Sequence, residues 1–272
     1  MKFSSTTKRK LAADILIPIA VIYIIVCTAA YFFQGYLLYP ASLMDPQDAP
    51  PAWERIELPV KGAGNVEAFY KEPHADRPVI LFLHGNGGGI SDTVVATSAY
   101  VEAGYGVLMP EYPGYWGNPG KPGQKSLAAS ARAGMQWLED QGTPRSEVII
   151  IGNSIGSGPA IETAANGAGA LVIVSGMADL PDLVSRRLKV IPTFLLHDRY
   201  ENEAAIMDVD APVLIVHGDN DDLIPASHGA RLAKASGGEI VTAEGGHEIV
   251  FLAKAQNLVL GWLERNGPRS PA

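Results

Sequence analysis

The feature that most constrains this chain is an apolar run that stops abruptly at a serine framed by glycines. Residues 148–156 read VIIIGNSIG, and the residues that follow have helical spacing. A β-branched run of this kind predicts a buried strand, so the glycine-rich residues must form a sharp turn into a helix. Such a turn leaves no room for Cβ atoms beside the serine, which gives Gly152 and Gly156 a steric purpose.

Ser154 stands at the apex of this predicted turn. A G-x-S-x-G pattern between a strand and a helix is typical of the nucleophile elbow, which presents the serine hydroxyl for attack. The N–H group of Ile155 would then point at an anion that forms near this hydroxyl. The same pattern also arises by chance in loops rich in glycine and serine. The interpretation therefore requires a base, an acid and a second anion-binding N–H elsewhere in the chain.

The base is expected late in the chain. A serine hydroxyl is a poor nucleophile until a neighbouring base takes its proton, and a third group must orient that base. The elbow predicts the order serine, acid, histidine along the sequence. His247 follows the last predicted strand, 239–243, and precedes a closing amphipathic helix at 248–265. It is the candidate base, and the alternative is a solvated loop histidine.

The acid is expected in the loop that follows the strand at 213–216. Asp219, Asp221 and Asp222 all lie there, and Asp179 is a lesser candidate after the preceding strand. The residues alone leave the choice open. A calcium site built from the three loop aspartates is an alternative interpretation.

A glycine-rich loop follows the apolar strand predicted at 78–83. Residues 84–89 read HGNGGG and match neither G-x-G-x-x-G nor G-K-[ST], so a phosphate cradle is not favoured. The loop instead predicts an oxyanion hole, in which the N–H groups of Asn86 and Ile155 point at one oxygen. His84 is expected to brace the loop rather than act as a base. Gly85 and Gly87 are expected to border the substrate.

The N-terminal residues have the composition of a membrane anchor. Residues 1–10 form a basic tail, and residues 15–33 are uncharged and dominated by isoleucine, valine, alanine and aromatic residues. A helix of this length crosses a bilayer core. A basic start and an aromatic cluster at 31–39 predict a single-pass anchor at 11–33. The N-terminus would be cytoplasmic and the domain extracytoplasmic, whether periplasmic or extracellular. A signal peptide cleaved after Ala30 and a soluble intracellular protein are the alternatives.

Composition sets the remaining bounds on the chain. Its 272 residues are 47% hydrophobic and 18% charged, as in globular proteins, and the net charge of −8 argues against nucleic acid as a partner. One cysteine, Cys27, rules out an intrachain disulfide and a cysteine-based zinc site. We expect a linker at 34–52, a single domain at 53–267 and a C-terminal tail at 268–272.

Strands alternate with helices along the predicted domain, which indicates an α/β fold. The expectation is a mostly parallel, doubly wound sheet with an antiparallel hairpin at its N-terminal edge. Ser126 is expected to cap a helix at 126–141. The span 175–211 has room for a small lid near a bilayer or for ordinary helices that cover the sheet. Further strands are predicted at 56–60, 66–70, 105–109 and 170–174, and a further helix at 91–103.

Short stretches along nearly the whole chain together resemble the α/β-hydrolase superfamily. The closer resemblance is to the Bem46-like proteins and to α/β-hydrolase-domain-containing proteins of types 13 and 17, which are membrane-anchored serine hydrolases. The matching stretches are FQ at 33–34, LYP at 38–40, HGNGG at 84–88, YPGY at 112–115, GNSIG at 152–156, DRY at 198–200, HGDND at 217–221 and GH at 246–247.

The resemblance assigns roles that the residues alone leave open. The acid in that family ends an H-G-x-x-D pattern, which here selects Asp221. Tyr115 and Trp116 lie in a loop that borders the family's pocket. Trp116 replaces a common glycine there and Asn118 a common serine, so the departure concerns substrate preference.

The combined expectation is a membrane-anchored serine hydrolase that cleaves carboxylic, acyl or lipid-like esters through an acyl-enzyme. Ser154, Asp221 and His247 would form the triad, with Asn86 and Ile155 as the oxyanion hole. No cofactor or metal is implied, and the oligomeric state is left open. The alternatives are a peptidase or a depalmitoylase-like thioesterase of the same fold, and a non-catalytic scaffold that binds lipid or a partner protein.

Overall fold

The computed structural model describes residues 5–40, 50–74, 77–86 and 90–268. In these ranges an eight-stranded sheet has the order β1-β2-β4-β3-β5-β6-β7-β8. The strands are β1 Glu54–Val60, β2 Gly64–Lys71, β3 Val79–Leu83, β4 Gly106–Pro110, β5 Val148–Asn153, β6 Ala170–Val174, β7 Val213–Gly218 and β8 Glu239–Ala243. The α-helices are α1 Ser5–Leu38, α2 Ile90–Glu102, α3 Gln124–Asp140, α4 Ser157–Ala164, α5 Leu180–Arg187, α6 Asn202–Ala205, α7 Ala226–Ser236 and α8 Ala253–Asn266.

The sheet is antiparallel only at its N-terminal edge. β1 pairs with β2 and β2 with β4 in antiparallel register, and every later neighbour is parallel. The predicted α/β fold with an N-terminal hairpin is therefore confirmed. Parallel strands that point the same way end at one edge of the sheet, and residues after such strands are the ones that meet there. β3, β5 and β7 accordingly bring residues 84–86, Ser154 and the 219–222 loop to that edge.

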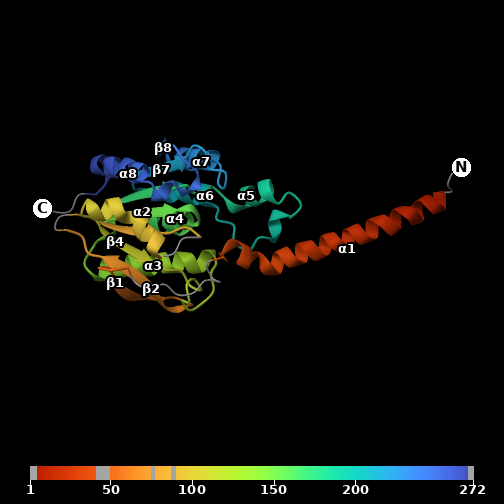
Figure 1. Ribbon diagram of the computed structural model, residues 1–272, viewed down its shortest axis with the longest axis horizontal. Helices are drawn as coiled ribbons and strands as arrows, with labels where there is room; N and C mark the ends of the chain where they lie inside the picture. The colour runs from red at the N-terminus through yellow and green to blue at the C-terminus, as the bar shows by residue number, and fades with distance from the viewer. Residues whose placement is uncertain (1–4, 41–49, 75–76, 87–89, 269–272) are drawn as a thin grey trace.

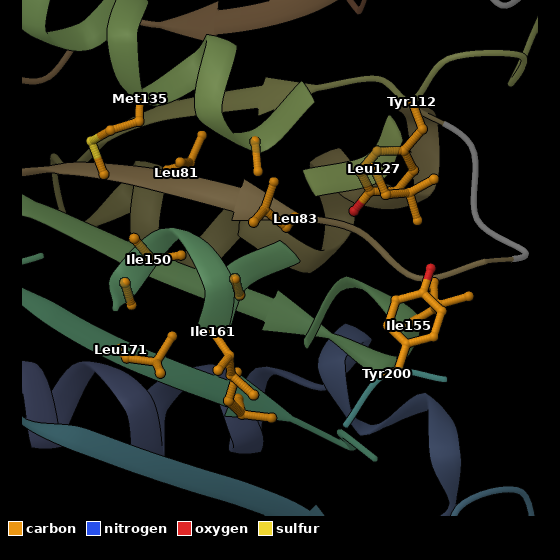
Figure 2. Packing of buried hydrophobic residues seen from close by; sticks show 14 of the residues in the cluster. Leu81, Leu83, Tyr112, Leu127, Met135, Ile150, Ile155, Ile161, Leu171 and Tyr200 are labelled. Carbon is orange, nitrogen blue, oxygen red and sulfur yellow. The ribbon is translucent and has the colours of Figure 1, made fainter. Parts of the chain in front are cut away.

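The continuous apolar runs predicted as buried strands are covered on both faces by helices. Leu81, Ile150 and Leu171 pair across β3, β5 and β6 and point to one face, where Met135 of α3 and Ile161 of α4 pack on them (Figure 2). The alternate residues of the same strands pack on the other face against α2 and α8. A sheet buried on both faces needs apolar side chains at successive positions, which explains the unbroken runs.

α1 projects from one end of the domain as a long helix (Figure 1). Its candidate membrane span is Asp14–Leu38, with a mean hydropathy of 2.5. The helix continues past Phe33, the predicted end of the anchor, to Leu38. Gly35 does not interrupt the helix: the Tyr39 N–H donates to the Gly35 carbonyl at 2.9 Å, as in a regular helical turn. Pro40 follows Tyr39, and helical geometry is disfavoured for a residue that precedes proline, which explains why α1 ends here.

The last turns of α1 are held by the domain. Gln34 is buried, and its side chain donates to the Leu195 carbonyl at 3.0 Å and accepts from the His197 N–H at 2.8 Å. The hydroxyl of Tyr39 lies 2.5 Å from Asp198 Oδ2 and 2.9 Å from the Tyr200 hydroxyl. These contacts fix the end of the helix against the chain that follows α5.

Two local predictions were wrong. Ser126 does not cap α3: the helix begins two residues earlier, at Gln124, and the Ser126 hydroxyl donates to the carbonyls of Lys121 and Gly123. The closing helix begins at Ala253 rather than at 248, because an extended Leu252 separates it from a 3₁₀ turn, η6 His247–Phe251. That turn carries His247 as its first residue, at the edge of the sheet where Ser154 lies.

Candidate active site

The elbow has the strained geometry that the sequence predicts. Ser154 follows β5 directly, begins the 3₁₀ turn η3 Ser154–Gly156 and has a φ of 52°. A non-glycine residue in the left-handed region is uncommon and clusters at functional sites. A Cβ at Gly152 would lie 2.5 Å from Ala160 Cβ, and one at Gly156 would overlap the Leu83 carbonyl oxygen. Both glycines are therefore needed for the turn to pack against β3 and α4.

The elbow glycines allow a stability prediction. Gly156→Ala is expected to lower the free energy of unfolding by about 1–3 kcal/mol or more, because the new Cβ meets backbone that cannot move away. Gly261→Ala is the matched control, since its Cβ would meet only Arg265 Nη1 at 3.8 Å within α8. The control should raise stability by roughly 0.5–1 kcal/mol. Denaturant unfolding of both variants measures the difference, and equal stabilities would contradict the packing argument.

His247 connects Ser154 to Asp221 by two hydrogen bonds. Its Nε2 lies 2.9 Å from Ser154 Oγ, and its Nδ1 lies 2.9 Å from Asp221 Oδ2. A carboxylate beside Nδ1 keeps the proton on that nitrogen, which leaves Nε2 as the acceptor for the serine hydroxyl. The three residues come from the ends of β5, β7 and β8, and they lie in the chain order that an elbow predicts.

Asp221 is held in place as a buried carboxylate. Its Oδ1 accepts the N–H groups of Leu223 at 2.9 Å and Ile224 at 2.7 Å, while His217 Nε2 lies 3.4 Å from Oδ2. Burial alone would raise the pKa of this carboxyl. Hydrogen bonds from His217, His247 and the Ile224 N–H have the opposite and larger effect, so the pKa lies well below its usual range. The side chain is therefore ionised wherever histidine titrates.

The other candidate acids have different partners. Asp219 Oδ1 accepts from Asn220 Nδ2 at 2.8 Å and from the Gly245 N–H at 3.0 Å, so it braces the loop before His247. Asp179 caps α5 through the Asp182 N–H and forms an ion pair with Arg231 at 2.6 Å. Asp222 is exposed. Of the candidates, Asp221 is the one whose carboxylate the structure places against His247.

The glycine-rich loop reaches the same edge at Gly85 and Asn86. A Cβ at Gly85 would lie 2.9 Å from Asn153 Oδ1 and 3.3 Å from Ser154 Cβ, so glycine permits the close approach of this loop to the elbow. The Asn86 side chain donates to the Leu38 carbonyl and accepts from the Tyr115 hydroxyl. Gly87, which we expected to border the substrate, lies outside the described residues.

His84 braces this loop from beneath. Its Nδ1 lies 2.8 Å from the Gly85 carbonyl and its Nε2 lies 3.3 Å from Glu111 Oε2, while the Tyr112 hydroxyl donates to its carbonyl at 3.0 Å. Burial lowers the pKa of His84, but the nearby Glu111 carboxylate attracts the protonated ring and outweighs that effect, so the pKa lies above its ordinary value. Both ring nitrogens thus face groups other than Ser154, namely the Gly85 carbonyl and the Glu111 carboxylate.

A cavity of about 500 Å³ opens over Ser154 and His247. Sequence reasoning missed most of its wall, since no motif marks residues that meet only in the folded chain. Tyr115 and Trp116, expected beside the substrate, are not among the described residues that line it: Tyr115 is fully buried beneath Asn86, and Trp116 packs on the core. The remaining lining residues are Pro40, Phe82, His84, Gly85, Asn86, Asp92, Thr93, Ala96, Asn153, Leu223, Glu248, Val250 and Phe251.

Comparison with known proteins agrees with this geometry. The profile of the Alpha/beta hydrolase family matches residues 80–204, which include the elbow. An uncharacterized protein of Mycobacterium tuberculosis is 35% identical over 162 residues, 58% of this chain and 58% of its own. Alpha/beta hydrolase domain-containing protein 17B of Homo sapiens is 33% identical over 163 residues, 56% of this chain and 53% of its own.

A more distant relative covers more of the chain. Lysophosphatidylserine lipase ABHD12 of Danio rerio is 24% identical over 218 residues, 72% of this chain and 56% of its own. The chain thus spans a little over half the length of these curated relatives.

Among solved structures, esterase Pf2001 of Pyrococcus furiosus superposes with a TM-score of 0.66. The superposition covers 83% of this chain and 98% of that one at 16% identity, which shows a shared fold. The sheet order, the strained elbow and these similarities lead to one conclusion. The chain belongs to the α/β-hydrolase superfamily, and its curated relatives include proteins of the ABHD type.

Proposed function

We propose that the chain is a membrane-anchored serine hydrolase that cleaves carboxylic esters. The observation that carries the proposal is the hydrogen-bonded series from Ser154 through His247 to Asp221, with 2.9 Å at each step. A serine at a strained elbow, next to a correctly oriented imidazole, is an activated nucleophile. The cavity above it gives a substrate access to the hydroxyl.

The reaction follows from the positions of these groups. Ser154 Oγ attacks the acyl carbon and its proton passes to His247 Nε2, while Asp221 stabilises the imidazolium that forms. The N–H groups of Asn86 and Ile155 are the proposed donors to the tetrahedral oxyanion. The bond to the alcohol then breaks, and His247 returns the proton to the leaving oxygen. Water, activated by His247, attacks the acyl-enzyme, releases the carboxylic acid and restores Ser154.

An acyl ester is the substrate class that the cavity favours. Its wall combines the apolar side chains of Phe82, Ala96, Val250 and Phe251 with polar side chains that include Asp92 and Glu248. Such a lining suits a hydrocarbon chain whose ester group lies at the nucleophile. The name of the Danio rerio relative, a lysophosphatidylserine lipase, describes chemistry of the same kind.

The proposed anchor is α1. Its candidate span of 25 residues has the length and hydropathy needed to cross a bilayer core. Lys8, Arg9 and Lys10 precede the span, and basic residues favour the cytoplasmic side of a membrane. We therefore propose a cytoplasmic N-terminus and an extracytoplasmic hydrolase domain.

Labelling with a fluorophosphonate probe tests the nucleophile directly. The full chain in membranes is expected to be labelled, and Ser154→Ala is expected to abolish labelling because the probe reacts with activated serines. Ser98→Ala is the matched control: Ser98 is an exposed serine of α2, and its loss should leave labelling unchanged. A wild-type chain that is folded by circular dichroism but stays unlabelled would refute the proposal.

A further inference from the structure

A short segment after α5 exposes large apolar side chains. We define residues 188–195, which include the 3₁₀ turn η4 Thr193–Leu195, as the apolar loop. Phe194 is 78% exposed, Val190 66% and Leu188 49%. Single exposed apolar residues are ordinary, but several within one short loop mark a contact with an apolar phase or partner.

The apolar loop lies beside α1. Leu195 shares an apolar groove of about 260 Å³ with α1 side chains between Tyr23 and Phe32. Gln34 is hydrogen-bonded to the Leu195 carbonyl, and the Tyr31 and His197 rings meet edge to face at 4.5 Å. Figure 1 shows α5 and the chain after it projecting from the same end of the domain as α1.

The position along α1 at which the apolar loop makes contact indicates that the loop faces lipid. All α1 residues of the groove lie inside the candidate span Asp14–Leu38. A helix rises about 1.5 Å per residue, so Gln34, whose side chain bonds to the Leu195 carbonyl, lies roughly 6 Å along the axis from Leu38, and Phe32 in the groove lies roughly 9 Å from it. A bilayer core is about 30 Å thick. When α1 spans the membrane, Leu195 therefore lies beside a part of the helix that is at the depth of lipid.

The basic residues at the start of the apolar loop are typical of a segment at the headgroup region of a membrane. Arg187 and Lys189 lie at the start of the apolar loop, although the chain as a whole carries a net charge of −8. Arg186, one residue earlier, forms an ion pair with Asp182 at 3.0 Å. All three cations are exposed. Basic side chains next to an inserted apolar segment extend toward the lipid headgroups and are attracted by anionic ones.

We propose that the apolar loop is a second membrane contact. Val190 and Phe194 insert into the leaflet that faces the domain, beside α1, and Arg187 and Lys189 lie at the level of anionic headgroups. The inference rests on the proposed anchoring by α1, and its partner is a lipid bilayer.

The apolar loop is connected to the rim of the cavity. Arg187 donates to the carbonyls of Asp222 and Leu223, and Leu223 borders the cavity above Ser154. Pro40, two residues beyond the end of α1, borders it as well. The two membrane contacts thus hold the cavity entrance at the bilayer surface. Given the proposed hydrolase activity, the substrate class is an ester that resides in the membrane.

Cysteine labelling measures the depth of the apolar loop. Cys27 is the only cysteine in the chain, so Cys27→Ser gives a background for single cysteines at Val190 and Phe194. Leu258→Cys is the control, on an exposed position of α8 at the other end of the domain (Figure 1). Each variant carries an environment-sensitive fluorophore in vesicles of phosphatidylcholine with phosphatidylglycerol.

The expected result is blue-shifted emission at positions 190 and 194 that spin-labelled lipids quench and aqueous iodide does not. Position 258 should show the opposite behaviour. Emission and iodide quenching at 190 and 194 equal to those at 258 would overturn the proposal. The same insertion in pure phosphatidylcholine vesicles would overturn the part that concerns anionic headgroups.

A second measurement tests the consequence for substrate. Val190→Ser combined with Phe194→Ser should lower hydrolysis of an ester embedded in vesicles by about tenfold or more, because two apolar side chains no longer hold the entrance at the lipid. Hydrolysis of soluble p-nitrophenyl butyrate should be unchanged. Equal loss on both esters would overturn membrane delivery. A wild-type chain that hydrolyses neither ester, with quenching at 194 intact, would refute the hydrolase proposal alone.

Discussion

Replacement of His247 by alanine is expected to lower kcat for p-nitrophenyl ester hydrolysis by about 10⁶-fold. Ser154 Oγ has its hydrogen bond at 2.9 Å to His247 Nε2, and without it no positioned base removes the proton. Residual turnover should come from substrate binding and the oxyanion donors. The loss is measured by following p-nitrophenol release over long incubations with the purified full chain in detergent. His74→Ala is the control, because His74 is exposed and is not among the described residues that line the cavity.

The double variant Ser154→Ala, His247→Ala distinguishes a joint mechanism from independent effects. Residues that act as one unit lose their contribution once, so the double variant should be no slower than either single variant. A loss equal to the product of the two single losses would show that Ser154 and His247 contribute separately. That outcome would contradict the proton transfer between them.

Asp221→Asn is expected to lower kcat by about 10⁴-fold with little change in KM. An amide at this position can donate to His247 Nδ1, which favours the tautomer whose Nε2 carries the proton and cannot accept from Ser154. The geometry should otherwise survive, because the carboxamide oxygen can still accept from the Leu223 and Ile224 N–H groups. Steady-state kinetics on Asp222→Asn gives the control, since Asp222 is exposed and should retain nearly full activity.

The depressed pKa of Asp221 also constrains the pH profile. A carboxyl whose folded pKa is lowered keeps its charge above that pKa and loses it only as the pH falls through it. The partners of Asp221 put that loss below the usual range of aspartate. The acid limb of kcat/KM for the wild type should therefore contain no ionisation of Asp221 within the usual pKa range of aspartate. An ionisation in that range that Asp221→Asn removes would contradict the assignment of Asp221 as a permanently charged partner.

The elbow and the strand order could be predicted because their signals are local. The run at 148–151 is apolar at successive positions because β5 is buried on both faces, and Gly152 and Gly156 are required by backbone packing. The strand–helix alternation then implies that the ends of parallel strands meet. These relations need only the sequence and the geometry of a sheet.

The choice among the aspartates could not be made from local sequence. Asp219, Asp221 and Asp222 occupy one loop and have the same chemistry, so the resemblance to a known family had to select between them. In the structure the difference comes from the loop's path: the Leu223 and Ile224 N–H groups turn the Asp221 side chain toward His247, whereas Asp219 bonds to Gly245. Such a path is not encoded in residue type.

The contacts of α1 with the domain could not be predicted either. Gln34 and Tyr39 look like the polar end of an anchor in the sequence, yet their partners lie 159–163 residues later. The cavity wall could not be predicted for the same reason, because it joins residues far apart in the sequence, such as Phe82 and Val250. Long-range pairs of this kind follow from the complete fold, and the Asn86 side chain depends on one of them through the Leu38 carbonyl.

The junction between α1 and the domain sets where a version of the domain without the apolar helix can begin. Truncation after Tyr39 would remove the partners of the Leu195 carbonyl, the Asp198 carboxylate and the Asn86 amide. A fully buried polar group left without a partner costs about 1–3 kcal/mol, and these three groups are partly buried, so each costs at most about that much. A truncated chain therefore has to retain Gln34 and the residues after it, so the last turn of α1 belongs to the folded body of the domain.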